Sequence, residues 1–383
     1  MQDVIYLDNN ATTRPLPEVV EGMLPYLREA YANPSSVHKF GQAARYQVEC
    51  ARERVAALIG AQPREIVFTS CGTEAINLAI RGALRANPNK RRFVTTAVEH
   101  SAVLRVADRL KADGYDVEFV GVDREGRVDL DEWRAALTDD TALASIMHAN
   151  NETGVILDVQ TLAGVAAERG VPVHVDAVQS IGKVPVNVTD WPVQLLSMSA
   201  HKFHGPKGIG ALYVRRRTRL APLILGGSQE RDLRGGTENV PGIIGMMIAA
   251  QAILDDGGRS MERVRRLRDR LEAGIRGAVP FAHVNGAGAE RIANTSNISF
   301  EALEAEAILI LLSEAGICAS SGSACSSGSL EPSHVLKAMG IPPAVAHGAV
   351  RFSLSKFTTE EEIDRVVSAL PELLSRLTAL TAR

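Results

Sequence analysis

The chain has few cysteines and no pattern that would join them. Cys50, Cys71, Cys318 and Cys325 are the four cysteines of 383 residues, and no Cys-x-x-Cys pair or Cys/His cluster is present. The sequence therefore predicts neither a disulfide framework nor a structural zinc site. Cys50 and Cys318 lie in or beside apolar runs, so we expect both to fill core positions.

Long runs of one charge and long apolar runs are also missing. Lys and Arg number 42 against 45 Asp and Glu, a formal net charge of −3, so we expect no nucleic acid as a main partner. The most apolar segments, 240–254 and 305–312, are shorter than the roughly 20 residues that cross a bilayer. Residues 1–10 lack the basic start and apolar middle of a signal peptide. We therefore expect a cytoplasmic protein without a membrane span.

Short apolar runs alternate with amphipathic segments between about residues 50 and 215. This alternation predicts βαβ units around a mainly parallel sheet. A Gly-rich linker at 226–236 precedes a long helical stretch through Ala278 and an α+β C-terminal part. The predicted strands are 66–69, 92–96, 142–147, 172–176, 195–199, 210–214, 297–300, 317–319 and 349–354, and the predicted helices include 43–58, 73–84, 101–112, 159–168, 304–314 and 359–377.

Two polar residues come at the ends of neighbouring predicted strands. Asp176 ends the strand 172–176, and the strand 195–199 runs directly into Ala200-His201-Lys202. Ligands of open α/β sheets bind outside the carboxyl ends of the strands, so Asp176 and Lys202 should face one crevice. They could form a plain ion pair. They also match a pyridoxal phosphate site, which needs a lysine for covalent attachment and an acid opposite the ring nitrogen.

A phosphate cradle is available where the strand 66–69 gives way to Ser70-Cys-Gly72-Thr73 and a helix. Backbone N–H groups at a helix N-terminus bind anions, although simple N-capping by Thr73 is an alternative. Ser199 and His201 could add donors to the same phosphate. His100, between a strand and a helix, could cover the cofactor ring or shuttle protons, or it could only cap the helix.

Other polar groups are predicted near the same sheet edge. Asn150 and Asn151 follow the strand 142–147, and Gln179 follows Asp176 by three residues, so their amides could bond a phenolic oxygen or a carboxylate. Arg351, in a strand of the C-terminal part, is a candidate bidentate clamp for a substrate carboxylate. The polar segment 234–239 is unsuited to a core and could reach the phosphate of a neighbouring subunit.

Cys325 lies within 319–329, where every other residue is Ser, Gly or Ala. Little in this segment can pack a core, so the position favours a reactive thiol over a buried one. Composition alone leaves peptidase, redox and metal chemistry open.

Together these motifs resemble those of the cysteine desulfurases of the NifS and IscS type, which are pyridoxal phosphate enzymes of the aminotransferase fold. The resemblance covers nearly the whole chain, and residues 326–334 bring it closer to NifS. The motifs that carry it are 6–13 (YLDNNATT), 33–36 (NPSS), 98–100 (VEH), 150–154 (NNETG), 176–179 (DAVQ), 199–202 (SAHK) and 320–325 (SSGSAC).

The resemblance implies a fold of the pyridoxal phosphate type I class. We expect a large α/β domain over 15–255 with a mainly parallel seven-stranded sheet, and a smaller α+β domain formed by 1–14 and 256–383 that carries the catalytic loop 319–329. A homodimer is also implied, in which Thr237 of one subunit reaches the cofactor phosphate of the other.

The resemblance also assigns roles to single residues. Lys202 would attach the cofactor covalently, Asp176 would face the ring nitrogen, Gln179 would bond the phenolic oxygen and His100 would stack on the ring. Asn151, chosen over Asn150 on the resemblance alone, and Arg351 would face the substrate. The phosphate would be held by Gly72, Thr73, Ser199, His201 and Thr237.

The hypothesis for the reaction is that Lys202 removes the α-proton of L-cysteine and the Cys325 thiolate attacks the substrate sulfur, giving alanine and a persulfide. His100 is the candidate base for the thiol. An iron–sulfur scaffold protein is the expected acceptor, in a nitrogenase-related role, and Cys325 could transiently ligate a cluster shared with it. The alternatives are a housekeeping IscS-type desulfurase, a selenocysteine lyase, another pyridoxal phosphate transferase, or a non-enzymatic sulfur-binding partner.

Overall fold

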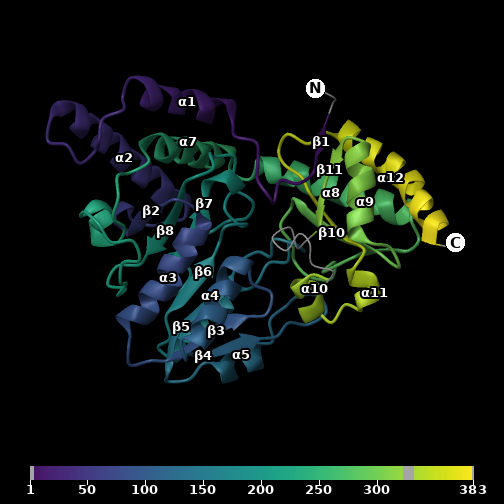
Figure 1. Ribbon diagram of the computed structural model, residues 1–383, viewed down its shortest axis with the longest axis horizontal. Helices are drawn as coiled ribbons and strands as arrows, with labels where there is room; N and C mark the ends of the chain where they lie inside the picture. The colour runs from purple at the N-terminus through teal and green to yellow at the C-terminus, as the bar shows by residue number, and fades with distance from the viewer. Residues whose placement is uncertain (1–3, 322–331, 382–383) are drawn as a thin grey trace.

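The computed structural model describes residues 4–321 and 332–381. Figure 1 shows a larger α/β unit, coloured purple to teal, beside a smaller unit that contains the C-terminal helices. Cys325 lies outside the described residues.

The larger unit is built on a seven-stranded sheet. Its strands, in spatial order, are β2 (Ile66–Thr69), β8 (Gly210–Val214), β7 (Leu195–Ser199), β6 (Val173–Asp176), β5 (Thr141–Met147), β3 (Arg92–Thr96) and β4 (Asp116–Val120). The five strands from β7 to β4 run parallel, whereas β8 is antiparallel to both of its neighbours. The predicted mainly parallel sheet is confirmed.

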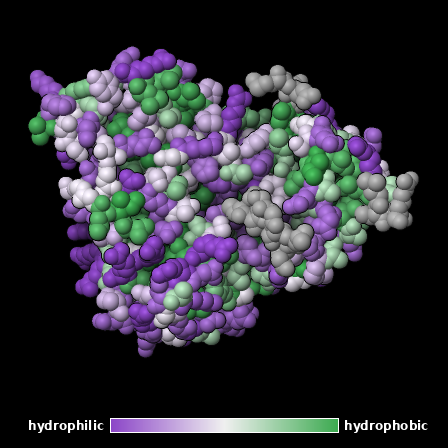
Figure 2. Space-filling view, in the orientation of Figure 1, coloured by the Kyte–Doolittle hydropathy of each residue, from purple (hydrophilic) through white to green (hydrophobic). Residues whose placement is uncertain are grey.

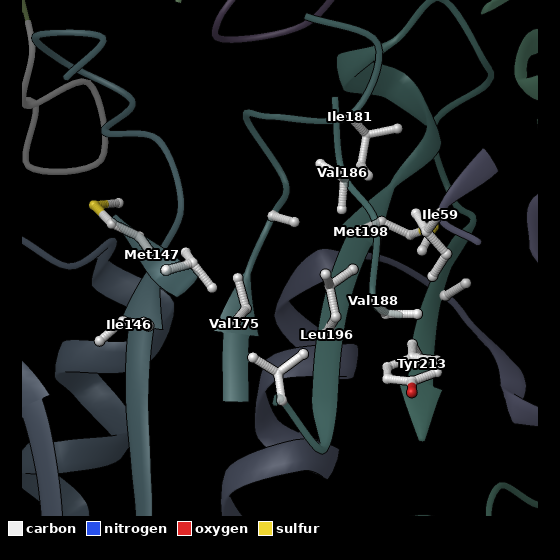
Figure 3. Packing of buried hydrophobic residues seen from close by; sticks show 14 of the residues in the cluster. Ile59, Ile146, Met147, Val175, Ile181, Val186, Val188, Leu196, Met198 and Tyr213 are labelled. Atoms are coloured by element: carbon white, nitrogen blue, oxygen red, sulfur yellow. The ribbon is translucent and has the colours of Figure 1, made fainter. Parts of the chain in front are cut away.

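Side chains on alternate positions of the strands face two different layers of helices. Val67, Leu195 and Leu212 pack with helices α3 (Gly72–Ala86) and α4 (Ser101–Ala112) on one face. Leu196 and Tyr213, one position further along, pack on the other face. Figure 3 shows part of this second cluster, around Leu196 and Tyr213. This period of two is expected for strands buried on both faces. The second layer is formed by α1 (Pro17–Arg28), α2 (Lys39–Leu58), α5 (Leu130–Ala136), α6 (Val159–Glu168) and α7 (Val240–Asp256).

The smaller unit has its own buried cluster. Ile5 and Leu7 from the N-terminal segment pack there with Phe300 and Phe352. Its strands form an antiparallel sheet of β12 (Ser320–Ser321), β13 (Ala349–Ser353), β10 (Thr295–Phe300) and β9 (Ala282–Val284), and a parallel pair of β1 (Ile5–Tyr6) and β11 (Ile317–Cys318). Its helices are α8 (Arg259–Ala278), α9 (Ala305–Glu314), α11 (Pro343–Ala346) and α12 (Glu360–Thr381). The boundaries of the two predicted domains stay a prediction.

Helix α10 (His334–Ala338) shows how closely the two units interlock. Although it belongs to the C-terminal part of the sequence, Val335 and Leu336 pack in the cluster of the larger unit. The chain that follows the Cys325 segment is therefore anchored on the larger unit. The part of the chain that the structure describes also has three short 3-10 helices, η1 (Pro63–Glu65), η2 (Ala200–Lys202) and η3 (Gln229–Asp232).

Some expectations differ from the structure. The helical stretch through Ala278 is two helices, because Gly257 and Gly258 adopt left-handed backbone angles with φ of 58° and 86°. Such angles suit glycine and end a helix.

Cys50 and Cys318 are only partly buried, so the prediction that they fill the core is wrong. Among the described helices none alone is long and apolar enough to cross a membrane; only α7 and α8 taken together, bent by 81°, pass that test.

Candidate active site

A cavity of about 1070 Å³ lies at the carboxyl ends of β5, β6 and β7, where Met147, Asp176 and Ser199 end their strands. This is the edge at which open α/β sheets bind ligands. The predicted site residues that line it are Gly72, Thr73, His100, Asn151, Asp176, Gln179, Ser199, His201, Lys202 and Arg351. The structure brings these side chains together, while their individual roles stay predictions.

Asp176 and Lys202 enter the cavity from adjacent strands. Asp176 is 5% exposed, and its Oδ1 accepts a hydrogen bond of 3.0 Å from the backbone N–H of Val178. Burial raises the pKa of the Asp176 carboxyl, whereas the neighbouring His100, the backbone N–H of Val178 and Lys202 act in the opposite direction. Lys202 lies in η2, directly after β7. A buried carboxyl and an amine therefore face the same space.

Asn10, from the segment after β1, organises the centre of this arrangement. Its backbone oxygen accepts from Lys202 Nζ at 2.5 Å and from Gln179 Nε2 at 2.9 Å. Lys202 Nζ also donates to the backbone oxygen of Ala11 at 2.9 Å. Backbone carbonyls thus hold the amine at the cavity wall. The sequence analysis considered only charged partners for Lys202 and did not predict these contacts. The pair Asn9-Asn10 in the 6–13 motif was the available signal.

The predicted phosphate cradle is formed by the N-terminus of α3 and the end of β7. The N-cap is Cys71, whose sulfur accepts from the backbone N–H of Glu74 at 3.5 Å, so N-capping by Thr73 is wrong. The N–H groups of Gly72 and Thr73 belong to the first turn and have no partner within the helix. A Cβ at Gly72 would lie 2.9 Å from Val178 Cγ2, so a larger residue there would have to displace the Val178 side chain.

Ser199 and His201 supply further donors beside this helix terminus. Ser199 is buried, and its Oγ has no hydrogen-bond partner among the described residues. Burial, with help from Lys202, Lys207 and Lys183, lowers the pKa of His201 to about 4, so its imidazole is neutral at pH 7. A buried hydroxyl without a partner is unfavourable unless a ligand completes it. The donor set fits a phosphate group.

His100 caps α4 and lines the cavity at the same time. Its Nδ1 accepts from the backbone N–H of Ala102 at 3.1 Å. In the neutral ring this bond places the proton on Nε2, so His100 can donate from Nε2 but cannot accept a proton there. The predicted role as a base therefore requires the cap bond to break. A role as a ring that covers a cofactor needs no such change.

The two asparagines after β5 have different surroundings. Asn150 is buried, and its Oδ1 accepts from the backbone N–H groups of Glu152 and Thr153, both at 2.9 Å. Its side chain is used to form the turn. Asn151 instead lines the cavity. The surroundings thus favour Asn151 as the residue that faces a ligand.

Arg351 is fixed by partners on two sides. Its Nη2 donates to Asp8 Oδ1 at 2.9 Å, and its Nη1 donates to the backbone oxygen of Asn151 at 3.0 Å. The side chain is 3% exposed, and Nε has no partner among the described residues. The guanidinium is therefore held at the cavity wall with one N–H unpaired.

The segment that carries Cys325 starts and ends beside the cavity. Ser320 pairs with Arg351 between β12 and β13. On the other side, Pro332 and His334 line the cavity, and His334 Nε2 lies 2.9 Å from the backbone oxygen of Glu99.

Thr237 is exposed and does not line the cavity of its own chain. Within the described residues, no group of three or more His, Cys, Asp or Glu side chains could hold a metal ion.

Glu99 is a buried carboxyl that sequence reasoning did not assign. Its Oε1 accepts from Thr96 Oγ1 at 2.7 Å and from the backbone N–H of Met147 at 2.8 Å, while Oε2 has no partner among the described residues. Burial, helped by the charge of Asp176, raises the pKa of Glu99 to about 8. Glu99 is therefore protonated at neutral pH and adds no negative charge beside Asp176.

Comparison with known proteins gives one consistent family. The chain is 54% identical over 378 residues to a cysteine desulfurase from Trichormus azollae, covering 99% of this chain and 94% of the relative. It is 51% identical over 374 residues to the cysteine desulfurase NifS from Azotobacter vinelandii, covering 97% and 93%.

Solved structures agree. A NifS-like protein matches with a TM-score of 0.91 and 40% identity, covering 97% of this chain and 99% of that chain. SspA in complex with cysteine matches with a TM-score of 0.82 and 34% identity, covering 93% and 100%. The sheet and the strand-end site thus define a protein of the pyridoxal phosphate fold type I class. Within that class, the chain belongs to the aminotransferase class-V family, which matches residues 5–366.

Proposed function

We propose that this protein is a pyridoxal phosphate-dependent cysteine desulfurase that converts L-cysteine to L-alanine and keeps the sulfur as a persulfide on Cys325. One observation supports it most strongly. A single cavity gathers Lys202, Asp176 and Arg351 beside both ends of the segment that carries Cys325. The names of the relatives that match nearly the whole chain support the same reaction.

Different residues of the cavity would contact different parts of the cofactor. Pyridoxal phosphate, when bound, supplies an electron-accepting ring that stabilises negative charge on the substrate α-carbon. Lys202 would hold its aldehyde carbon, Asp176 would face the ring nitrogen and Gln179 would donate to the phenolic oxygen. His100 would cover the ring face. Gly72, Thr73, Ser199 and His201 would hold the phosphate, a role supported by the free helix N-terminus and the unpaired Ser199 hydroxyl.

The substrate would be held and deprotonated by three residues. Arg351 would bind the carboxylate of L-cysteine, with Asn151 beside it. The Lys202 amine would take the α-proton. The thiolate of Cys325 would then attack the substrate sulfur, so that a carbon–sulfur bond breaks and a sulfur–sulfur bond forms. The former β-carbon would gain a proton, and the α-carbon would regain one from Lys202. The products are alanine and the Cys325 persulfide.

A homodimer is part of the proposal. Thr237 would reach the cofactor phosphate of the other subunit. Leu225, twelve residues before Thr237 in the sequence, is 78% exposed. Tyr31, Val37 and Tyr46 are also exposed large hydrophobics at the N-terminal helices, and Figure 2 shows hydrophobic residues over the end of the molecule that carries α1. Large apolar side chains exposed close together favour an interface.

The sulfur acceptor and the location of the enzyme belong to the proposal as well. An iron–sulfur scaffold protein in a nitrogenase-related role is the acceptor that the likeness to NifS suggests, in a cytoplasmic setting. Cys325 could ligate a cluster transiently with that scaffold. Transfer of labelled sulfur from the persulfide to a purified scaffold tests this part separately.

The test of the reaction is direct. Purified protein is incubated with pyridoxal phosphate, L-cysteine and a thiol reductant, and alanine and sulfide are measured. We expect alanine and sulfide in equal amounts. A protein that binds the cofactor but releases neither product, or that converts L-cysteine by amino transfer to a 2-oxo acid without sulfide, would contradict the proposal.

A further inference from the structure

Lys183 lies beside the candidate site, although sequence reasoning gave it no role. It follows Gln179 by four residues in the turn after β6. The backbone N–H of Ile181 bonds the oxygen of Ala177, and Gly182 ends this turn with a φ of 76°. A Cβ at Gly182 would lie 2.8 Å from Ile253 Cδ1. The turn therefore needs glycine there and returns the Lys183 side chain toward Gln179.

The Lys183 amine bonds two side-chain amides. Its Nζ lies 2.5 Å from Gln179 Oε1 and 3.1 Å from Asn10 Oδ1. The Asn10 amide has a settled orientation, because its Nδ2 donates to the backbone oxygen of Asn151 at 3.1 Å and its Oδ1 accepts from Asn294 Nδ2 at 3.0 Å. Lys183 thus connects a fixed amide to the amide of Gln179.

The orientation of the Gln179 amide follows from its two neighbours. Asn10 contributes a backbone carbonyl oxygen, which can only accept, and this oxygen lies 2.9 Å from Gln179 Nε2. On the other side, Lys183 supplies N–H donors to Oε1. A rotated amide would place its oxygen against a carbonyl oxygen and its N–H groups against the amine. Both contacts favour the same arrangement, in which Nε2 is the atom available to the cavity.

We propose that Lys183 is a positioning residue that locks the Gln179 amide with its N–H group toward the ligand cavity. This inference rests on the proposed function, in which Gln179 donates to the phenolic oxygen of the cofactor. One N–H of Gln179 Nε2 bonds Asn10, and the second is left for that oxygen. Lys183 itself touches neither cofactor nor substrate in this account.

The charge state of Lys183 does not alter the argument. Burial, with the positive charges of Lys202 and Arg351, lowers the pKa of the Lys183 amine. A neutral amine still carries two N–H donors, one for each of its acceptors, Gln179 Oε1 and Asn10 Oδ1. Lys183 can therefore orient the Gln179 amide whether its side chain is a charged ammonium or a neutral amine.

The experiment measures pyridoxal phosphate affinity in a double-mutant cycle of Lys183→Met and Gln179→Ala. The dissociation constant is obtained by equilibrium dialysis, and the visible absorbance of the bound cofactor is titrated with pH. We expect Lys183→Met to weaken binding about tenfold and to raise the pH midpoint of the absorbance change, since an oriented donor to a charged oxygen is lost. In the Gln179→Ala background, the same change should weaken binding by less than about twofold.

Matched variants separate this role from loss of charge or of folding. Lys207 is exposed, and Lys207→Met should leave the affinity within about twofold of wild type. Lys183→Gln keeps an N–H donor, and its affinity for pyridoxal phosphate should stay within about threefold of wild type. Lys183→Glu, whose side chain has the same shape as glutamine but no N–H donor, should bind about tenfold more weakly. The second pair carries the test if Lys183→Met does not fold.

Equal losses from Lys183→Met in both backgrounds, or no loss in either, would overturn the inference. So would a Lys183→Gln variant as weak as Lys183→Glu. A wild-type protein that binds no pyridoxal phosphate contradicts the proposed function and this inference with it. Tight wild-type binding with additive losses contradicts the inference alone.

Discussion

Arg351 Nη2 donates to Asp8 Oδ1 across 2.9 Å, and this ion pair joins the strand β13 to the N-terminal segment at the wall of the cavity. The arginine is thereby held in one position before any substrate binds. Its Nε has no partner among the described residues, and Nη1 and Nη2 each carry a second N–H beyond the one that bonds Asn151 or Asp8. A carboxylate that enters the cavity would meet an oriented cation, which is the arrangement that favours bidentate binding.

This pair leads to a prediction for Arg351→Lys. A lysine keeps the charge but loses the planar fork, so we expect kcat/KM for L-cysteine to fall roughly 10- to 100-fold, mainly through KM. Initial rates of sulfide release measure it. The control is Arg291→Lys, since the Arg291 side chain is 8% exposed and pairs with Glu272 at 2.7 Å outside the cavity. Equal losses in both variants would show that Arg351 serves stability only.

Lys202→Ala tests covalent attachment of the cofactor. Without the amine we expect the visible absorbance of the purified protein to disappear after gel filtration, because only non-covalent contacts remain. Lys207→Ala, at an exposed lysine of the same loop, should keep the wild-type spectrum. An unchanged spectrum in Lys202→Ala would refute the assignment.

Several features of the site could be predicted from the sequence because they are local. Buried strands such as β6 and β7 read as short apolar runs, and Asp176 and Lys202 come where those runs end. The sheet order then brings the two together. The carboxyl edge of the sheet was therefore the right place to look for a site.

The contacts that hold the site in place could not be predicted, since they join distant parts of the chain. The backbone carbonyl of Asn10 accepts a hydrogen bond from Lys202, 192 residues away in the sequence. No local sequence pattern predicts such a bond. The same holds for Asp8 and Arg351. The strand β4, at the edge of the sheet, also escaped prediction, because its exposed and half-buried residues give no apolar run.

Glu99 gives a pH prediction. Its pKa is about 8 in the folded protein against 4.5 as the ordinary value, so only the unfolded chain releases its proton between these pH values. The contribution of Glu99 to stability is complete below about pH 4.5 and falls as pH rises to about 8, by up to about 1.4 kcal/mol per pH unit.

Glu99→Gln removes this ionisation while keeping an oxygen for the Thr96 hydroxyl and the Met147 N–H. Urea unfolding at pH 5, 6, 7 and 8 should show the variant gaining stability relative to wild type as pH rises. Glu314→Gln, at an exposed glutamate, should show no such trend. A constant difference between Glu99→Gln and wild type across this range would contradict the assignment of Glu99 as a protonated buried acid.

Mixed dimers test the role of Thr237. Lys202→Ala and Thr237→Ala are expected to be impaired as separate homodimers. A mixed dimer contains one site with Lys202 from one subunit and Thr237 from the other, so we expect up to about half of the wild-type activity per dimer from that intact site. Tagged subunits are co-expressed and purified through both tags. If Thr237 acted within its own subunit, the mixed dimer would contain no intact site and activity would not return.

The central claim is that Cys325 receives the sulfur of L-cysteine, and mass spectrometry of the protein after one turnover without reductant tests it most directly. The account predicts one added sulfur on the peptide that contains Cys325, with one alanine released, in wild type and in the matched variants Cys50→Ala, Cys71→Ala and Cys318→Ala. Cys325→Ala should keep the cofactor absorbance and gain no sulfur. Normal sulfide release by Cys325→Ala, or the added sulfur on another cysteine, would contradict the account.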